Sequence, residues 1–267
     1  MSKDYAGDYV RDYDRRMDIL LQTFGADEQA LREQLLAPLH LKPGARVLET
    51  GCGTCRDTVH LASHAARVVA TDLSADMIRG GRSAIAGSDA IRRVRFSVAD
   101  ATALPFAAGV FDAAYHFGGL NLFRDIRQGL AEMARVVRPG GRVVAGDEGL
   151  APWLADSEFG KILLNSNPLY RFQPPLGLLP AAARDVACRW VLNGAFYVID
   201  FTVGEGEPFL DLDVEFPGAR GGSHRTRYFG KLDGVSPDLK QQAVDAASRE
   251  GLSLTAWLEK TLRRALK

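Results

Sequence analysis

The stretch that decides the fold is Arg46–Arg56, with the sequence RVLETGCGTCR. An apolar strand runs into small residues and then into a segment with the composition of a helix. Gly51 and Gly53 have no Cβ atom, so a ligand can approach the main chain closely at this turn. The helix that follows presents unpaired backbone N–H groups, which bind polar ligand groups. The segment therefore predicts a ligand site between the first strand of a sheet and the next helix.

Outward from this turn, short apolar runs alternate with helical stretches. Strands that alternate with helices at such spacing indicate βαβ units, and therefore an α/β fold with a parallel sheet covered on both faces. We expect strands at 47–48, 68–70, 94–98, 111–117 and 142–145, and helices at 56–64, 74–85 and 125–137.

The alternation changes after Asp147. Residues 149–182 are rich in Pro, Gly and Leu, and we expect either a surface connection or a lid over a substrate. Runs at 195–203 and 210–216, joined by a turn at 204–208, are expected to complete the sheet as an antiparallel hairpin.

Three domains are expected from these boundaries. Residues 1–44 predict a helical cover, with Asp27 as a helix N-cap. Residues 45–217 form the ligand-binding domain, and a boundary at Pro217-Gly218 separates a tail, 218–267.

Composition and charge exclude several classes of protein. The 33 basic and 33 acidic residues give a net charge of zero, so no global positive field exists for general nucleic-acid binding. With 46% hydrophobic and 25% charged residues, the chain resembles an ordinary globular protein. We expect no membrane span, because no apolar run reaches about 18 residues, and no secretory signal. Three cysteines give no disulfide framework, which favours a cytoplasmic location.

The glycine turn does not fit a dinucleotide site, because residue 56 is arginine where the G-x-G-x-x-G pattern requires its third glycine. It resembles motif I of class I S-adenosylmethionine (SAM)-dependent methyltransferases, with Thr50 in place of an apolar residue and Cys55 in place of the last glycine. Four further segments follow in the family's order: VVATDLS at 68–74, FSVADA at 96–101, LPF at 104–106 with FD at 111–112, and RPGGR at 138–142.

The resemblance covers about residues 45–147 and implies a Rossmann-like, doubly wound, seven-stranded sheet with SAM as cofactor. It implies that Asp72 binds the ribose hydroxyls, with a helix N-cap as the alternative, and that Asp100 binds the adenine amino group. Tyr9 and Tyr13 either cover SAM or belong to a plain amphipathic helix. The expected cofactor-binding residues are Tyr13, Glu49, Thr50, Gly51, Cys52, Gly53, Asp72, Leu73, Met77, Asp100, Ala101 and His116.

In an open α/β sheet, ligands bind outside the carboxyl ends of the strands, so we expect the methyl acceptor there. A base is needed only if the acceptor still carries a proton at attack. The candidate catalytic residues are His116, Asp147 and Tyr170, although His116 could equally be a hydrogen-bonded histidine at a strand end. Aromatic surface mixed with polar groups suits a small polar or cationic acceptor, although packing alone also explains each aromatic residue. The expected substrate-binding residues are Asn121, Glu148, Trp153, Asn165, Asn167 and Tyr197.

Cys52 and Cys55 have the C-x-x-C spacing of redox and zinc sites. No second pair of ligands follows, so we expect no metal and interpret Cys55 as an incidental substitution.

The tail predicts a strand followed by two helices. Arg225, Arg227 and Lys231 alternate with Tyr228 and Leu232, and the helices begin at Ser236-Pro237 and Ser253. This order resembles the ribbon-helix-helix fold of dimeric DNA-binding proteins. Because so small a unit cannot bury its apolar stripes alone, we expect a homodimer through the tail, or packing of the tail on the main domain. DNA binding is the weaker alternative.

The predicted function is therefore methyl transfer from SAM to a small-molecule acceptor. One alternative is an enzyme that transfers or cyclises the aminocarboxypropyl arm of SAM and releases methylthioadenosine. Another is a SAM-responsive DNA-binding regulator that acts through the tail.

Overall fold

The computed structural model describes residues 7–65, 67–218, 221–228 and 235–267, with side chains from residue 12 onward. The chain divides into two compact units, Met1–Pro208 and Phe209–Lys267, which we call the core unit and the tail unit. The division falls before the boundary expected at Pro217-Gly218.

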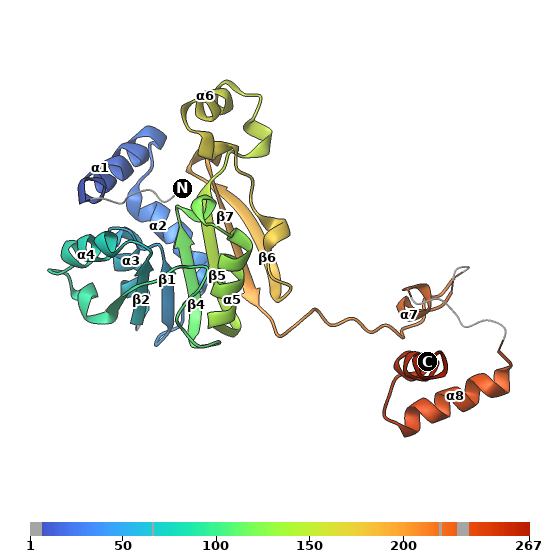
Figure 1. Cartoon of the computed structure of the whole chain (residues 1–267). Helices are drawn as coiled ribbons and strands as arrows, with labels where there is room; N and C mark the ends of the chain where they lie inside the picture. Colours follow the sequence, from blue (N-terminus) through green and yellow to red (C-terminus); the bar gives the residue numbers. More distant parts are fainter. Residues whose placement is uncertain (1–6, 66, 219–220, 229–234) are drawn as a thin grey trace. The chain divides into compact units, whose positions relative to one another are not determined.

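A seven-stranded sheet lies at the centre of the core unit (Figure 1). Its strand order is β3-β2-β1-β4-β5-β7-β6. Strands β1 to β5 are parallel, whereas β7 runs antiparallel to both β5 and β6. The predicted α/β sheet with an antiparallel end is thereby confirmed. The strands are β1 Arg46–Thr50, β2 Arg67–Asp72, β3 Val94–Val98, β4 Phe111–Phe117, β5 Val137–Glu148, β6 Ala183–Val191 and β7 Phe196–Val203.

Helices cover both faces of this sheet. Successive side chains of a strand point to opposite faces of the sheet. In β1, Val47 packs in one core cluster with Leu61 of α3, and Leu48 packs in the other cluster with Leu130 of α5. Among the described residues, no helix combines the length and the apolar character needed to cross a membrane. The helices of the core unit are α1 Gly7–Phe24, α2 Glu28–Leu36, α3 Arg56–His64, α4 Ala75–Ala84, α5 Ile126–Val136 and α6 Glu158–Ser166.

Side-chain caps mark where four of these helices begin, including α6, which Ser157 caps. Asp27 accepts a hydrogen bond from the backbone N–H of Ala30 at the start of α2. Ser74 caps α4 and Asp125 caps α5 in the same way. The N-cap predicted at Asp27 is therefore confirmed.

The terminal hairpin differs from the prediction. It pairs β6 with β7, and residues 210–216 contribute no strand to the sheet. The turn between β6 and β7 contains Leu192, Asn193 and Gly194, with φ of 49°, 55° and 90°. An Asn-Gly pair is a strong hairpin signal because both residues tolerate positive φ, and the sequence interpretation overlooked it.

Two connecting segments are more regular than expected. Residues 138–142, expected as a turn before the fifth strand, belong to β5, whose pairing with β4 shifts register between Phe111 and Ala113. Residues 149–182 contain α6 and short 3-10 turns at 152–154, 168–171 and 176–178.

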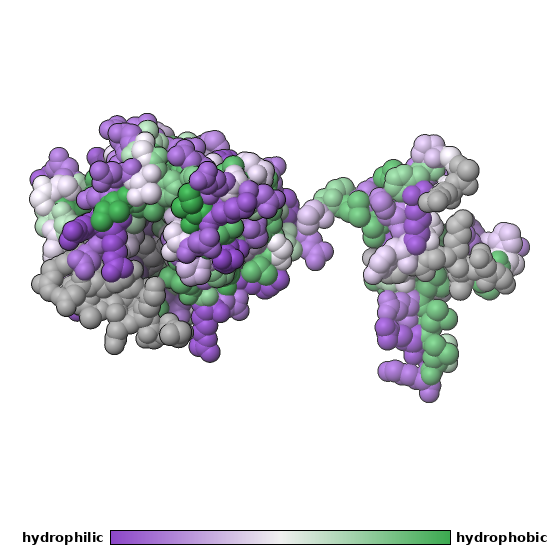
Figure 2. All heavy atoms as spheres, turned by 90° about the horizontal axis from the view of Figure 1, so that it is seen from above, coloured by the Kyte–Doolittle hydropathy of each residue, from purple (hydrophilic) through white to green (hydrophobic). Residues whose placement is uncertain are grey.

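The tail unit contains α7 His224–Tyr228, α8 Pro237–Arg249 and α9 Leu254–Ala265. The strand predicted here is wrong for its described part, because His224–Tyr228 is helical; Lys231 and Leu232 lie outside the described residues. The two helices and their caps, Ser236 and Ser253, agree with the prediction. Figure 2 shows a hydrophobic side and a hydrophilic side on α9.

Candidate functional site

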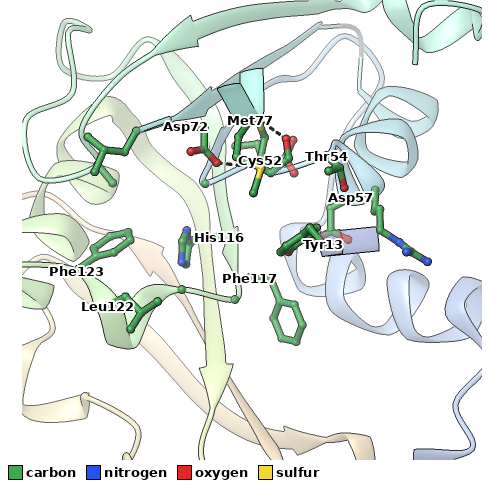
Figure 3. Close-up of a pocket in the computed structure, with 18 of the residues that line it drawn as sticks. Tyr13, Cys52, Thr54, Asp57, Asp72, Met77, His116, Phe117, Leu122 and Phe123 are labelled. Atoms are coloured by element: carbon green, nitrogen blue, oxygen red, sulfur yellow. Dashed lines mark hydrogen bonds between the residues drawn. The ribbon is translucent and has the colours of Figure 1, made fainter. Parts of the chain in front are cut away.

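A cavity of about 820 Å³ lies at the carboxyl ends of the parallel strands, the edge where open α/β sheets bind ligands. The segments that follow β1, β2, β3 and β4 all contribute to its lining. Helix α1 closes another side with Tyr13, Met17 and Leu20. Figure 3 shows side chains from these elements converging on one space.

The glycine turn after β1 leaves room that a side chain would fill. Gly51 and Gly53 have φ of 67° and 52°. A Cβ atom on Gly51 would lie 3.0 Å from Cε1 of His116, and one on Gly53 would lie 3.6 Å from the ring of Tyr13. Ligand groups can therefore reach the backbone of this turn from the cavity.

Cys55 continues the turn at φ 69°, a conformation that favours glycine and is unusual for a cysteine. Its side chain is fully buried against Gly81 of α4. A Cβ atom on Gly81 would lie 2.5 Å from Cys55 Sγ and 2.8 Å from the carbonyl oxygen of Gly53. The turn and α4 are thus in close contact because residue 81 has no side chain.

Asp72 connects the glycine turn to the start of α4. Its Oδ2 accepts a hydrogen bond from Gly53 N at 3.0 Å, and its Oδ1 accepts one from Ser74 N at 2.8 Å. Burial raises the pKa of Asp72. Each carboxylate oxygen has a further lone pair, so Asp72 can bind ligand hydroxyls while it holds the turn.

His116, at the end of β4, is fully buried in a defined tautomer. Its Nδ1 lies 2.8 Å from the carbonyl oxygen of Thr50, which only accepts hydrogen bonds, so Nδ1 carries the proton and Nε2 keeps a lone pair. Burial lowers the pKa of His116, so the ring is neutral near pH 7. The ring also packs against Phe123, with centroids 4.8 Å apart.

A second group of buried polar residues lies where α2, α3 and β4 meet. Arg32 Nη1 is 2.5 Å from Asp57 Oδ1, and Tyr115 donates a hydrogen bond to Asp57 Oδ2 at 2.9 Å. Glu49 accepts a hydrogen bond from Thr58 at 2.5 Å. Burial raises the pKa of Glu49 well above its ordinary value, and the negative charge of Asp57 adds to the effect. Arg32, Glu49 and Asp57 all line the cavity.

Helix α1 is tied to the glycine turn by polar contacts. Thr54 donates a hydrogen bond to Asp14 at 2.6 Å. Arg56 donates to Asp18 at 2.8 Å and to both carboxylate oxygens of Glu28 at 2.7 Å. The contacts to Asp14 and Asp18 hold α1 where Tyr13 borders Gly53, and the contact to Glu28 joins α3 to α2.

The opposite end of the cavity is mostly apolar. Glu148, Arg124 and the backbone of the two glycines at 118–119 are its polar components. Its apolar lining consists of Phe117, Leu122, Phe123, Leu169 and Phe196.

The predicted cofactor-binding residues converge on this cavity with one exception, Thr50, which bonds to His116 instead of lining the space. The side chain of Tyr9 lies outside the described residues. Those that line the cavity are Tyr13, Glu49, Gly51, Cys52, Gly53, Asp72, Leu73, Met77, Asp100, Ala101 and His116.

The structure does not bring the predicted catalytic and substrate-binding residues together. Of these, only His116 and Glu148 line the cavity. Asp147 is fully buried and accepts hydrogen bonds from the backbone of Asn121 and Glu148. Tyr197 donates a hydrogen bond to the Asn121 side chain at 2.8 Å. Asn121 therefore links Asp147 and Tyr197 in one buried hydrogen-bond network.

The predicted residues of segment 149–182 also lie outside the lining. Trp153 is 69% exposed and packs against Trp190, 5.1 Å between ring centroids. Asn167 caps the 3-10 turn that contains Tyr170, which packs against Phe196. Asn165 lies in α6 and does not line the cavity.

Several lining residues were missed by the sequence interpretation. Met17 and Leu20 follow Tyr13 at helical spacing, so a search for the face of α1 shared with Tyr13 would have found them. Phe196 and Leu169 reach the cavity because β7 and segment 149–182 pack beside it, and no local sequence pattern predicts that packing.

Comparison with known proteins agrees with this geometry. Residues 47–141 match the family model described as "Methyltransferase domain". The chain is 39% identical over 140 residues to a demethylmenaquinone methyltransferase of Corynebacterium glutamicum (strain R), which covers 52% of this chain and 56% of that protein. The chain thus spans about half the length of the curated relatives it matches.

Two solved structures share the fold. A candidate SAM-dependent methyltransferase from Methanococcus maripaludis aligns with a TM-score of 0.58 and 16% identity, over 78% of this chain and 98% of that one. The [4+2]-cyclase SpnF aligns with a TM-score of 0.50 and 17% identity, over 66% of this chain and 81% of that one. At such identities the likeness concerns the fold alone.

The family match, together with the glycine turn that lies within it, identifies residues 47–141 as a methyltransferase domain. Its cofactor is SAM. The residues present fit that group, because glycines leave the turn open beside Asp72 and because Arg32 Nε, buried at the cavity, has no hydrogen-bond partner among the described residues.

Proposed function

We propose that the protein transfers a methyl group from SAM to a small, largely apolar acceptor that carries an ionisable proton. The observation that carries this proposal is the cavity itself, in which a polar end at the glycine turn continues into an apolar end around Phe123. His116 contacts both ends, because it lies against Gly51 and packs against Phe123.

The chain's own residues supply positioning and a proton acceptor. Bound SAM supplies a methyl group on a positively charged sulfur. Asp72 holds the ribose, and Asp100 with Ala101 meets the adenine. His116 takes the acceptor's proton on Nε2, because its Nδ1 proton is held by Thr50. Tyr13, Met17 and Leu20 exclude water, since solvent in this space would compete for the same groups.

The acceptor end supports an apolar ring rather than the polar or cationic acceptor expected from the sequence. The name of the Corynebacterium relative specifies a demethylated quinone, and a planar apolar ring suits a space bordered by Phe117, Phe123 and Phe196. The reduced, hydroquinone form of demethylmenaquinone is therefore the first acceptor to assay, because its hydroxyl groups are ionisable and its ring carbon is nucleophilic, whereas the oxidised quinone has no proton to lose. Segment 149–182 serves as a lid in this proposal, because its Leu169 lines the cavity.

The decisive experiment is product analysis by mass spectrometry. The full chain is incubated with SAM and either chemically reduced demethylmenaquinone or a mixture of aromatic metabolites, and both by-products of SAM are measured. S-adenosylhomocysteine together with a methylated acceptor supports the proposal. Methylthioadenosine instead supports transfer or cyclisation of the aminocarboxypropyl arm. SAM binding without either by-product favours a SAM-responsive regulator, which a gel-shift assay with DNA at low salt then tests.

We also propose that the tail unit forms a homodimer. Its helices leave Leu239, Leu262 and Leu266 exposed, and Ala247 is the one apolar side chain among its described residues that is buried. Substituting Leu262→Glu is expected to convert a dimer into a monomer in light scattering of the full chain, because it places a charge on the apolar side of α9. Ala256→Glu, at an exposed position on the polar side of α9 with Glu259 and Arg263, is the matched control. A monomeric wild-type chain would reject the dimer.

A further inference from the structure

Unsatisfied polar atoms gather at one end of the cavity. Among the described residues, two buried side-chain nitrogen atoms, Arg32 Nε and His116 Nε2, have no hydrogen-bond partner, and two buried carboxylate oxygens, Asp57 Oδ1 and Asp200 Oδ1, have an arginine ion pair but no further hydrogen bond. Three of these four belong to residues that line the cavity, namely Arg32, Asp57 and His116. Buried polar groups are nearly always hydrogen-bonded in native proteins, so this concentration indicates groups that a ligand completes.

Arg32 and Asp57 form a largely buried ion pair. The Arg32 side chain is 3% exposed and the Asp57 side chain 11%, with Arg32 Nη1 2.5 Å from Asp57 Oδ1. Tyr115 of β4 fixes the other oxygen of Asp57, and Glu28 receives Arg32 Nη2 at 3.5 Å. The pair therefore presents one free donor, Nε–H of Arg32, next to one incompletely bonded acceptor, Oδ1 of Asp57.

A donor and an acceptor of opposite charge, side by side, match a zwitterion. A carboxylate would accept from Arg32, and an ammonium would donate to Asp57. Such a ligand adds no net charge to the buried site, whereas a simple anion or cation would leave one member of the pair facing a like charge.

The position of the pair fits one part of SAM. Asp72 and Asp100 follow β2 and β3, so the adenosine half extends to that side of the glycine turn. Asp57 lies on α3, directly after the turn, and bonds to Tyr115 of β4, on the other side of β1. The amino-acid end of SAM is a zwitterion, and it extends away from the adenosine.

We propose that Arg32 and Asp57 bind the amino-acid end of SAM, with Arg32 donating to its carboxylate and Asp57 accepting from its ammonium. The inference rests on the proposed function only in taking SAM as the ligand. It assigns a role to α2, which lies outside the segment 47–141 that matches the family model. The rival interpretation is a purely structural ion pair that joins α2 to α3.

Calorimetry with two ligands separates the two interpretations. S-adenosylhomocysteine carries the amino-acid end, and 5′-methylthioadenosine lacks it. Arg32→Met is expected to weaken S-adenosylhomocysteine at least about tenfold, the scale of a lost charged hydrogen bond, and to leave methylthioadenosine within about twofold. Asp57→Asn, which keeps a hydrogen-bonding side chain for Tyr115, is expected to behave likewise. Arg92→Met removes an exposed arginine that does not line the cavity and should change neither affinity.

Equal weakening of both ligands by Arg32→Met would overturn the proposal in favour of the structural pair, and so would no weakening at all. A ligand-only test covers the case in which the variants do not fold. Wild-type protein should bind decarboxylated SAM at least about tenfold more weakly than SAM, because the carboxylate that Arg32 would bind is missing. Equal affinities would refute the role of Arg32. Since no acceptor is present, these outcomes are independent of whether methyl transfer to any acceptor is detected.

Discussion

The contact between the glycine turn and α4 allows a sharp test at Gly81, a residue that does not itself line the cavity. In Gly81→Ala the new Cβ would lie 2.5 Å from Cys55 Sγ and 2.8 Å from the Gly53 carbonyl oxygen. The thiol has no flexible stem with which to retreat, and the second atom is backbone. The turn must therefore move away from α4, and the backbone that faces the cofactor moves with it.

Two opposing contributions determine the effect of Gly81→Ala on stability. Overpacking of this kind costs about 1–3 kcal/mol, whereas alanine is better than glycine inside a helix by about 1 kcal/mol. The free energy of unfolding should thus fall by up to about 2 kcal/mol, measured by urea denaturation without ligand. The affinity for S-adenosylhomocysteine, measured by calorimetry, should fall by more than the stability change suggests, because the displaced atoms belong to the turn.

Two further variants define the controls for Gly81→Ala. Gly87→Ala adds a Cβ atom that would meet nothing within 4 Å and should leave binding unchanged. Adding Cys55→Gly to Gly81→Ala removes the thiol contact but not the contact with Gly53, so it should restore part of the loss. A Gly81→Ala protein that is more stable than wild type by the full helix gain, with unchanged affinity, would refute the close packing of turn and helix.

Three other predictions follow from the site. Asp72→Ala should weaken S-adenosylhomocysteine binding by about 1–3 kcal/mol in calorimetry, and an unchanged affinity would mean that the ribose is held elsewhere. His116 has a lowered pKa in the folded state, so the unfolded state binds more protons below pH about 6.5. The stability of wild type relative to His116→Gln should accordingly fall as the pH drops through that value; parallel curves in denaturant titrations would contradict a buried neutral ring. The same His116→Gln variant should lose turnover with reduced demethylmenaquinone while S-adenosylhomocysteine still binds, and retained turnover would exclude His116 as the proton acceptor.

The part of the cavity at the glycine turn could be predicted from sequence because it is local. Gly51, Gly53 and Asp72 lie within a few residues of strand ends, and parallel strands bring those ends to one edge of the sheet. The positions of α3, α4 and α5 were predictable for a similar reason, since apolar periodicity and capping residues are short-range signals.

The acceptor half could not be predicted because it depends on packing between distant segments. Asn121, Asp147 and Tyr197 have the chemistry of a binding site, yet they satisfy one another inside the fold. The apolar lining comes instead from residues such as Leu169 and Phe196, which are apolar like most of the core. Arg32 was missed because a buried arginine in a helix has no sequence signature until its partner, Asp57, is placed beside it.

The attachment of α1 has a kinetic consequence. Tyr13, Met17 and Leu20 border the glycine-turn end of the cavity, and Arg56 anchors the helix that carries them through the carboxylate of Asp18 and the backbone of Asp14. We therefore expect exchange of cofactor for by-product to require movement of α1, and release of S-adenosylhomocysteine to be slower than diffusion alone would allow. Because the Arg56–Asp18 pair is partly exposed, added salt screens it and should accelerate this exchange. In such an enzyme the turnover number would rise with ionic strength while the chemical step, followed in a single turnover, would not.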